Sequence, residues 1–150
     1  MRLALEEAGA AFREGEVPVG AVVAKDGRPV ARAHNLREQT GDPTAHAELL
    51  AIREAARALG ARRLTGCTLY VTLEPCPMCA GAIINARLKS VCYGARDEKA
   101  GACGSVLNLF MEDFNHKPRL YGGVLREECA ALLQEFFHTL RKKGGISTLI

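Results

Sequence analysis

The sequence has no tryptophan and few other aromatic residues, with three Tyr and five Phe among 150 residues. It also lacks an apolar run approaching the ~18 residues that a membrane-spanning helix needs. Glu6 and Glu7 interrupt the start of the chain too early for a secretory segment. We therefore expect a soluble, cytoplasmic protein with no membrane contact. A composition that is 48% hydrophobic and 25% charged excludes global disorder, and the length fits one domain over residues 1–150.

The chain carries little excess charge of either sign. Its formal net charge is +3, and Arg141, Lys142 and Lys143 account for that excess. A neutral body with a basic tail from about residue 141 gives only weak support for nucleic-acid binding. The three cations equally fit the end of a solvated helix, where they interact with the negative end of the helix dipole.

Six cysteines are present, but without a secretory segment they do not indicate a disulfide framework. Two of them form the pair Cys76-Pro77-Met78-Cys79, a spacing that indicates metal or redox chemistry in a reducing compartment. The other four are isolated and are expected to be small buried hydrophobic residues: Cys67, Cys92, Cys103 and Cys129.

Hydrophobic periodicity predicts an α/β chain. Helices are expected over residues 2–14, 45–59, 76–86 and 126–143. Strands are expected over residues 19–24, 30–34, 68–73, 90–94 and near 120–124. Asp26-Gly27 is a hairpin turn signal, residues 35–44 are expected to be a polar loop, and 95–118 a long loop with a short helix near 106–111. This order predicts a mixed five-stranded sheet with helices on both faces, a three-layer α-β-α fold.

Two of the predicted helix starts carry the candidate chemistry. Cys76 and Cys79 are three residues apart, so in a first helical turn both sulfurs can face one point, where free N–H groups favour thiolates. With His46 they would form a three-ligand zinc site whose fourth position is open to water, as catalytic zinc requires. Zinc lowers the pKa of a bound water from 15.7 towards roughly 7.

Glu48 is the candidate proton shuttle beside this site. Residues two apart face nearly opposite sides of a regular helix, so His46 and Glu48 can face one zinc only if His46 lies at the very start of its helix. Thr44 is the expected N-cap for such a start.

Other readings of the same residues exist. A lone Cys-x-x-C after a strand is also typical of thioredoxin-like redox proteins, and a lone His-x-Glu occurs by chance. A non-catalytic zinc or RNA-binding module would have its site closed by Cys67, Cys92 or Cys103. A deaminase of a free base or nucleoside, such as guanine or cytosine, would use the same motif chemistry.

Taken together, His-x-Glu followed by Pro-Cys-x-x-Cys is the signature of zinc-dependent nucleobase deaminases. Over about residues 2–142 the chain resembles the bacterial tRNA-specific adenosine deaminases of the cytidine-deaminase-like superfamily. The resemblance rests on four stretches of the sequence: 16–22, 42–48, 69–82 and 94–97, the last followed by Lys99, Gly101 and Gly104-Ser105.

The resemblance implies roles for particular residues. His46, Cys76 and Cys79 would hold one zinc per subunit, and Glu48 would move protons. Asn35 would contact an extruded base through its side-chain amide. The pocket wall would comprise Val17, Pro18, Val19 and the backbone near Ala47. Contacts to the anticodon loop would come from Arg96, Asp97 and Lys99.

The implied reaction converts the wobble adenosine of a tRNA anticodon to inosine: hydroxide adds to C6, Glu48 protonates the ring nitrogen, and ammonia leaves. The family's homodimers imply that this chain pairs with a second copy, and the nearly all-apolar helix 76–86 is a reasonable surface for it.

The structural alternatives are a loop-capping Asn35, a core Val19 and an Arg96–Asp97 ion pair. Two residues depart from the family pattern. His34 replaces a common aromatic, and Cys103 is expected to be an accessible thiol near the substrate.

Overall fold

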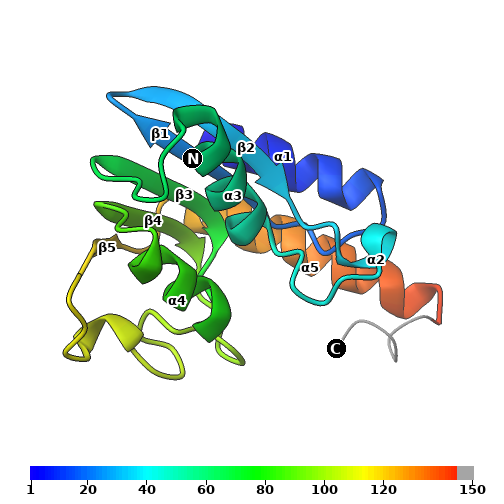
Figure 1. Cartoon of the computed structure of the whole chain (residues 1–150). Helices are drawn as coiled ribbons and strands as arrows, with labels where there is room; N and C mark the ends of the chain where they lie inside the picture. Colours follow the sequence, from blue (N-terminus) through cyan, green and yellow to red (C-terminus); the bar gives the residue numbers. More distant parts are fainter. Residues whose placement is uncertain (145–150) are drawn as a thin grey trace.

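A central sheet of five strands organises residues 1–144, the part of the chain that the computed structural model describes (Figure 1). The strands are β1 (Gly20–Lys25), β2 (Arg28–His34), β3 (Cys67–Leu73), β4 (Ser90–Ala95) and β5 (Arg119–Tyr121). Their spatial order is β2-β1-β3-β4-β5. β1 runs antiparallel to β2 and β3, whereas β3, β4 and β5 are parallel, so the sheet is mixed as predicted.

The antiparallel edge of the sheet is set by a tight hairpin. Asp26 and Gly27 both adopt positive φ angles, 51° and 74°, which matches the twist of the flanking strands. The hairpin pairs Gly20 with His34 at its open end. This places the end of β2, and the residues that follow it, beside the start of β1.

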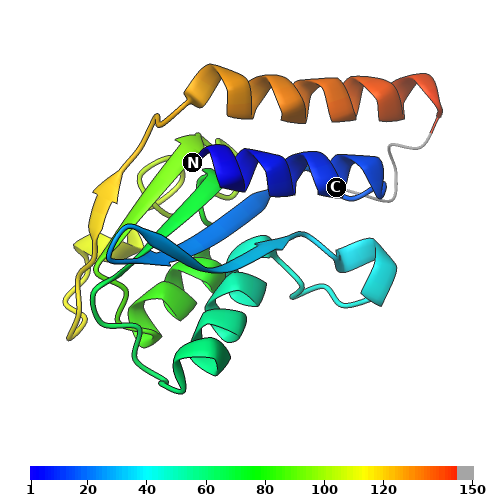
Figure 2. The same ribbon diagram turned by 90° about the horizontal axis from the view of Figure 1, so that it is seen from above.

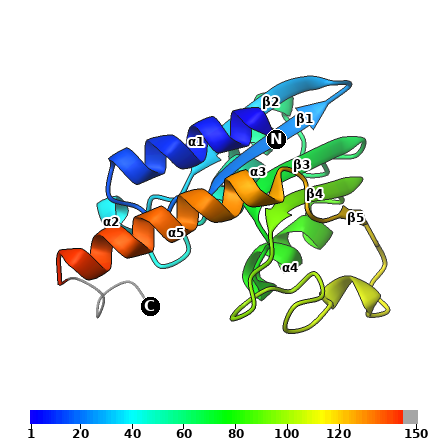
Figure 3. The same ribbon diagram turned by 180° about the vertical axis from the view of Figure 1, so that it is seen from behind.

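Two helices cover each face of the sheet. α1 (Arg2–Arg13) and α5 (Arg126–Lys142) lie side by side on one face (Figure 2), and Figure 3 shows the same pair from behind. α3 (Ala47–Leu59) and α4 (Pro77–Asn85) pack together on the other face. The predicted three-layer α-β-α arrangement is therefore confirmed.

α1 lies very close to the sheet because small residues meet at the contact. Ala4, Ala8 and Ala11 form its fully buried stripe. Opposite them stands Gly20, where an added Cβ would lie 2.0 Å from the Ala4 carbonyl oxygen. Backbone rather than side chain therefore sets this separation, and residue 20 must be glycine.

Several boundaries differ from the sequence prediction. The expected loop 35–44 contains a short helix, α2 (Arg37–Thr40), and the last strand ends at Tyr121. The expected short helix near 106–111 is a single 3-10 turn, η1 (Leu109–Met111). Within residues 1–144 no helix is both long and apolar enough to cross a membrane. The sequence beyond residue 144 lies outside the described residues.

Candidate active site

His46 lies at the start of α3, as the spacing to Glu48 requires. It is the N-cap residue, with extended backbone angles of −77° and 146°, and the helix begins at Ala47. The change of chain direction at this point lets His46 and Glu48 line the same cavity. The prediction that Thr44 is the N-cap was wrong: its N–H and hydroxyl both donate to Asp42 in the preceding turn.

The two cysteines occupy the corresponding position at the start of α4. Cys76 is the N-cap residue, Pro77 occupies the first turn, and Cys79 follows inside the helix. The sulfurs of Cys76 and Cys79 lie 3.6 and 3.5 Å from His46 Nδ1. Because α3 and α4 pack side by side, their N-terminal ends bring these three residues together.

These three side chains form the one group in residues 1–144 that could hold a metal ion through three or more His, Cys, Asp or Glu ligands. Their ligand atoms all lie within 4.8 Å of one another. The prediction of an open three-ligand set is thus matched in geometry, and none of the other cysteines joins it. Cys79 is fully buried and Cys76 partly so.

The electrostatics of the cluster favour one thiolate. The hydrogen bond with Cys79 lowers the pKa of Cys76 to about 4, against the opposing effect of burial, and His46 adds to the lowering. The same contact, together with burial, raises the pKa of Cys79. The hydrogen bond to Cys76 also raises the pKa of His46. Cys76 is therefore the sulfur with the greater thiolate character, and binding of a cation would release the protons held by the other two ligands.

Glu48 lies in the first turn of α3 and is 4% exposed. Burial raises the pKa of its carboxyl group to about 6. A carboxyl group with a pKa near the working pH can both accept and release a proton. Glu48 therefore places a titratable carboxyl group beside the His46–Cys76–Cys79 cluster.

A cavity of about 830 Å³ opens above this cluster, with His46, Glu48 and Cys76 in its lining. Six of the predicted substrate-contacting residues line it: Val17, Val19, Asn35, Arg96, Asp97 and Lys99. Pro18 and Ala47 are buried and do not reach its surface. A cavity of this volume is within the usual size range of small-molecule sites.

Asn35 has two roles that the sequence presented as alternatives. Its Oδ1 accepts the N–H of Ala47 at 2.8 Å, so it caps the start of α3. Its Nδ2 forms no hydrogen bond with the described residues, and the side chain lines the cavity. The amide N–H groups of Asn35 are therefore free to meet a ligand.

Asp97 organises its own loop. Its Oδ1 accepts the N–H groups of Lys99 and Ala100 at 3.0 and 3.1 Å. The alternative of an Arg96–Asp97 ion pair was wrong, because Arg96 pairs with Glu98 at 3.6 Å.

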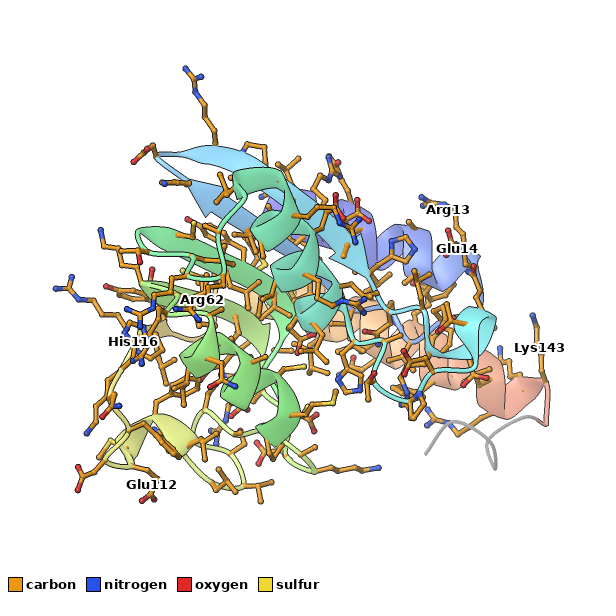
Figure 4. All side chains as sticks on the ribbon, viewed as in Figure 1. Arg13, Glu14, Arg62, Glu112, His116 and Lys143 are labelled. Carbon is orange, nitrogen blue, oxygen red and sulfur yellow. The ribbon has the colours of Figure 1, made fainter. Side chains whose placement is uncertain are left out.

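Part of the cavity wall comes from residues that were not predicted from the sequence. Arg37 lies in α2, and the last turns of α5 add Leu133, Gln134, Phe137, Leu140 and Arg141. Arg141 belongs to the basic run interpreted as a solvated helix end. That run does end α5, and Lys143 caps it (Figure 4), but Arg141 also lines the cavity. The apolar periodicity of α5 predicted that one of its faces is buried. Nothing in the sequence indicated whether that face packs on the sheet or lines a cavity.

Two departures from the family pattern have structural explanations. Cys103 is 6% exposed and burial raises its pKa to about 12, so the expectation of an accessible thiol was wrong. Both ring nitrogens of His34 form hydrogen bonds, one with Glu7 of α1 at 2.7 Å and the other with Glu14 at 2.8 Å. Glu14 lies just beyond the end of α1 (Figure 4).

Comparison with known proteins agrees with this geometry. Residues 1–141 match the MafB19-like deaminase family. The chain is 54% identical to the tRNA-specific adenosine deaminase of Bacillus subtilis over 144 residues, 95% of this chain and 89% of that protein.

Solved structures give the same result. One chain from a study of A-to-I editing by tRNA:A34 deaminases at the wobble position of transfer RNA has a TM-score of 0.86 and 48% identity, covering 89% of this chain and 97% of that one. A guanine deaminase from Bacillus subtilis is also similar, with a TM-score of 0.62 and 34% identity over 99% of this chain and 96% of that one. The chain therefore belongs to the MafB19-like deaminases, in the tRNA-specific adenosine deaminase family.

Proposed function

We propose that this protein deaminates adenosine to inosine at the wobble position of a tRNA anticodon loop. The observation that carries the proposal is a buried Glu48 beside the His46–Cys76–Cys79 cluster, at a cavity whose lining includes four basic side chains. Family membership supports the reaction. Phosphates of a substrate could meet the basic side chains, although the lining also carries four acidic ones: Glu48, Glu74, Asp97 and Glu98.

The cluster fits one zinc ion per subunit. An imidazole and two sulfurs are a typical zinc ligand set, and three protein ligands leave one position for water. The lowered pKa of Cys76 favours its thiolate, whereas Cys79, whose pKa is raised, would lose its proton when the ion binds. When bound, zinc would act as a Lewis acid that activates water for addition to C6 of adenine.

Glu48 moves the protons of the reaction. As a carboxylate it accepts a proton from the attacking water, and it then delivers that proton to the adenine ring nitrogen. Glu48 then takes the proton of the new C6 hydroxyl group and passes it to the exocyclic amine, so the C–N bond breaks, ammonia leaves and C6 becomes the carbonyl of inosine. The buried position of Glu48 shields these transfers from bulk water.

Asn35 orients the base, and Val17 and Val19 supply the apolar wall against which it packs. The Asn35 amide offers N–H donors to acceptor atoms on the edge of the ring. Its carbonyl oxygen is fixed by the Ala47 N–H, so the donor end is held in one direction. This arrangement selects among orientations of the base in the cavity.

Four cations on the cavity lining favour RNA over a free base: Arg37, Arg96, Lys99 and Arg141. Side chains of this kind neutralise phosphates. An adenosine must leave the base stack to reach Glu48, and a loop nucleotide can do so at lower cost than a paired one. The anticodon stem-loop is therefore the proposed partner. Because its substrate would be tRNA, we also propose that the protein acts in the cytoplasm.

We also propose that the chain is a single deaminase domain that forms a homodimer. Four residues around η1 are exposed: Val106, Leu107, Met111 and Phe114, with Met111 at 73%. η1 packs against α4, whose outward face carries Met78 and Ala82. A second copy would cover this apolar surface. Sedimentation at micromolar concentration should give twice the chain mass, and a stable monomer would contradict the dimer.

The reaction is tested by incubating the protein with bulk tRNA and with free guanine, cytosine and adenosine. We expect adenosine read as guanosine at position 34 after sequencing of the tRNA, and no product from the free compounds. Glu48→Ala should retain zinc while kcat falls by about 10²- to 10⁴-fold, the usual contribution of a general acid–base. Glu54→Ala, on the exposed side of α3, is the matched control and should leave kcat unchanged.

Deamination of free guanine or cytosine in place of tRNA would assign the chain to nucleobase metabolism instead. Full activity of Glu48→Ala on tRNA would refute the proton-carrying role.

A further inference from the structure

Two buried carboxylates have no part in the proton transfers described above: Glu74 belongs to the cavity lining, and Glu16 lies outside it. Glu16 is 1% exposed and Glu74 is 2% exposed. Within residues 1–144, neither lies within 4.0 Å of a lysine, arginine or histidine nitrogen. A buried charge without an ion-pair partner is costly unless hydrogen bonds replace its hydration. Both carboxylates receive those hydrogen bonds from segments that line the cavity.

Glu74 holds the loop that follows β4. It accepts the backbone N–H groups of Asp97 at 2.9 Å, Cys103 at 3.0 Å and Ser105 at 3.1 Å, and also the Ser105 hydroxyl. Burial alone would raise the pKa of Glu74, but these hydrogen bonds outweigh it and lower the pKa. Donors from three residues therefore converge on one side chain, which ties Asp97 to Cys103 and Ser105 across the loop.

The loop is shaped around this carboxylate. An added Cβ at Gly101 would lie 2.4 Å from Glu74 Cδ, so only glycine allows the backbone to pass so closely. The N–H of Ala102 donates to the Pro75 carbonyl at 2.8 Å and fixes the loop to the residue after Glu74. Arg96 and Lys99, two of the four cations on the cavity lining, belong to this loop.

Glu16 plays the corresponding part for α2. It accepts the N–H groups of Glu38 at 3.1 Å and Gln39 at 2.8 Å, in the first turn of the helix. The N-cap residue Leu36 provides no side-chain hydrogen bond. A four-residue helix is too short to be stable alone, so it depends on such external contacts. α2 carries Arg37, the third cation of the lining.

We propose that Glu16 and Glu74 are positioning residues for RNA recognition: each fixes one cation-bearing segment, and together they set the spacing of Arg37, Arg96 and Lys99 around the cavity. This inference rests on the proposed function. Because both carboxylates are engaged by backbone N–H groups of the segments that they hold, we expect their loss to weaken RNA binding more than the chemical step.

The test compares Glu74→Gln and Glu16→Gln with the wild-type zinc-loaded protein, using an anticodon stem-loop as substrate. An amide of the same shape offers one acceptor atom in place of two and turns an NH₂ group towards the N–H donors. We expect KM to rise by about tenfold in each variant, the scale of losing charge-assisted hydrogen bonds. Zinc content and kcat should stay within about twofold of wild type, since Glu48 and the metal ligands remain.

Amide hydrogen exchange supplies a readout that does not depend on activity. In Glu74→Gln the amides of Asp97, Cys103 and Ser105 should lose protection, whereas those of α2 should not. Glu16→Gln should show the reverse pattern. Ser105→Ala removes one donor to Glu74 without changing residue 74, and it also removes the acceptor of the Arg96 Nε–H at 3.1 Å. It should give a smaller rise in KM, with loss of amide protection in the same loop. Glu128→Gln, which only breaks the exposed pair with Arg2, is the control and should change nothing.

A Glu74→Gln protein that loses zinc or kcat at unchanged KM would overturn the proposal. That result would mean that Glu74 supports Cys76 and not the loop that carries Arg96 and Lys99. Unchanged amide hydrogen exchange in α2 and in the loop after β4 would also overturn the proposal. A wild-type protein that leaves the stem-loop unmodified would instead refute the proposed function, so the two failures are distinguishable.

Discussion

Asn35 allows a sharp test because its two polar atoms have separate tasks. Oδ1 caps α3 through the fully buried Ala47 N–H at 2.8 Å, and Nδ2 is free to meet the base. Asn35→Ala removes both functions, whereas Asn35→Asp keeps an oxygen at the helix start and removes only the donor. A carboxylate at a helix N-terminus is also favoured by the helix dipole.

The expected magnitudes follow from this separation. Asn35→Ala leaves a buried N–H without an acceptor, which should lower the free energy of unfolding by about 1–3 kcal/mol. Asn35→Asp should lose less than about 1 kcal/mol because the capping oxygen remains. Both variants should lose about 10- to 100-fold in kcat/KM, the value of one or two hydrogen bonds to the base.

Two measurements decide the matter. Urea unfolding gives the free energy difference, and inosine formation in an anticodon stem-loop gives kcat/KM. If Asn35→Asp retains wild-type kcat/KM, the amide donor does not hold the base and Asn35 only caps α3. If both variants are equally destabilised, the assigned hydrogen bond is not what stabilises the start of the helix.

Three further outcomes are expected. Cys76→Ser keeps an N-capping group and should fold, but zinc measured by elemental analysis should fall well below one per chain. Burial alone would lower the pKa of His34, but hydrogen bonds to its two glutamate partners raise it above 6.5. His34→Gln should therefore cost about 1–2 kcal/mol of unfolding free energy near pH 6, and this difference should shrink as the pH rises through the folded-state pKa. Gly20→Ala should cost about 3 kcal/mol in thermal unfolding because its methyl group meets the Ala4 backbone. Gly9→Ala in α1 should not, because its methyl group would meet only the end of the Arg13 side chain at 3.4 Å.

The chemical centre could be predicted from the sequence because its residues are close together in two short motifs. The spacing of His46 and Glu48 even required a particular position at the start of a helix, and α3 begins where that requirement places it. Cys76 and Cys79 follow the same logic in α4. The local geometry of a helix start is sufficient to align these groups, so their arrangement could be predicted from the sequence.

The cavity lining could not be predicted in the same way. Arg141 is 93 positions from Glu48 in the sequence, and nothing in the pattern of α5 indicates where its last turns lie. Arg37 was placed in a loop because α2 is held by Glu16 and not by its own helix propensity. Acidic residues are usually exposed, so nothing in the sequence marks Glu16 and Glu74 as buried, and only their hydrogen-bond partners in the folded chain show what they hold.

The division between centre and lining also has a functional consequence. The groups that would carry out deamination come from two helix starts packed on one face of the sheet, whereas the four cations come from α2, the loop after β4 and α5. Substitutions in these outer segments can alter what is bound while leaving Glu48 and its neighbours in place. A deaminase of free bases needs the same centre but gains nothing from phosphate-binding side chains. On the proposed function, we therefore expect substrate choice to depend on Arg37, Arg96, Lys99 and Arg141. Removing their charges should weaken binding of the stem-loop and reduce the salt dependence of that binding.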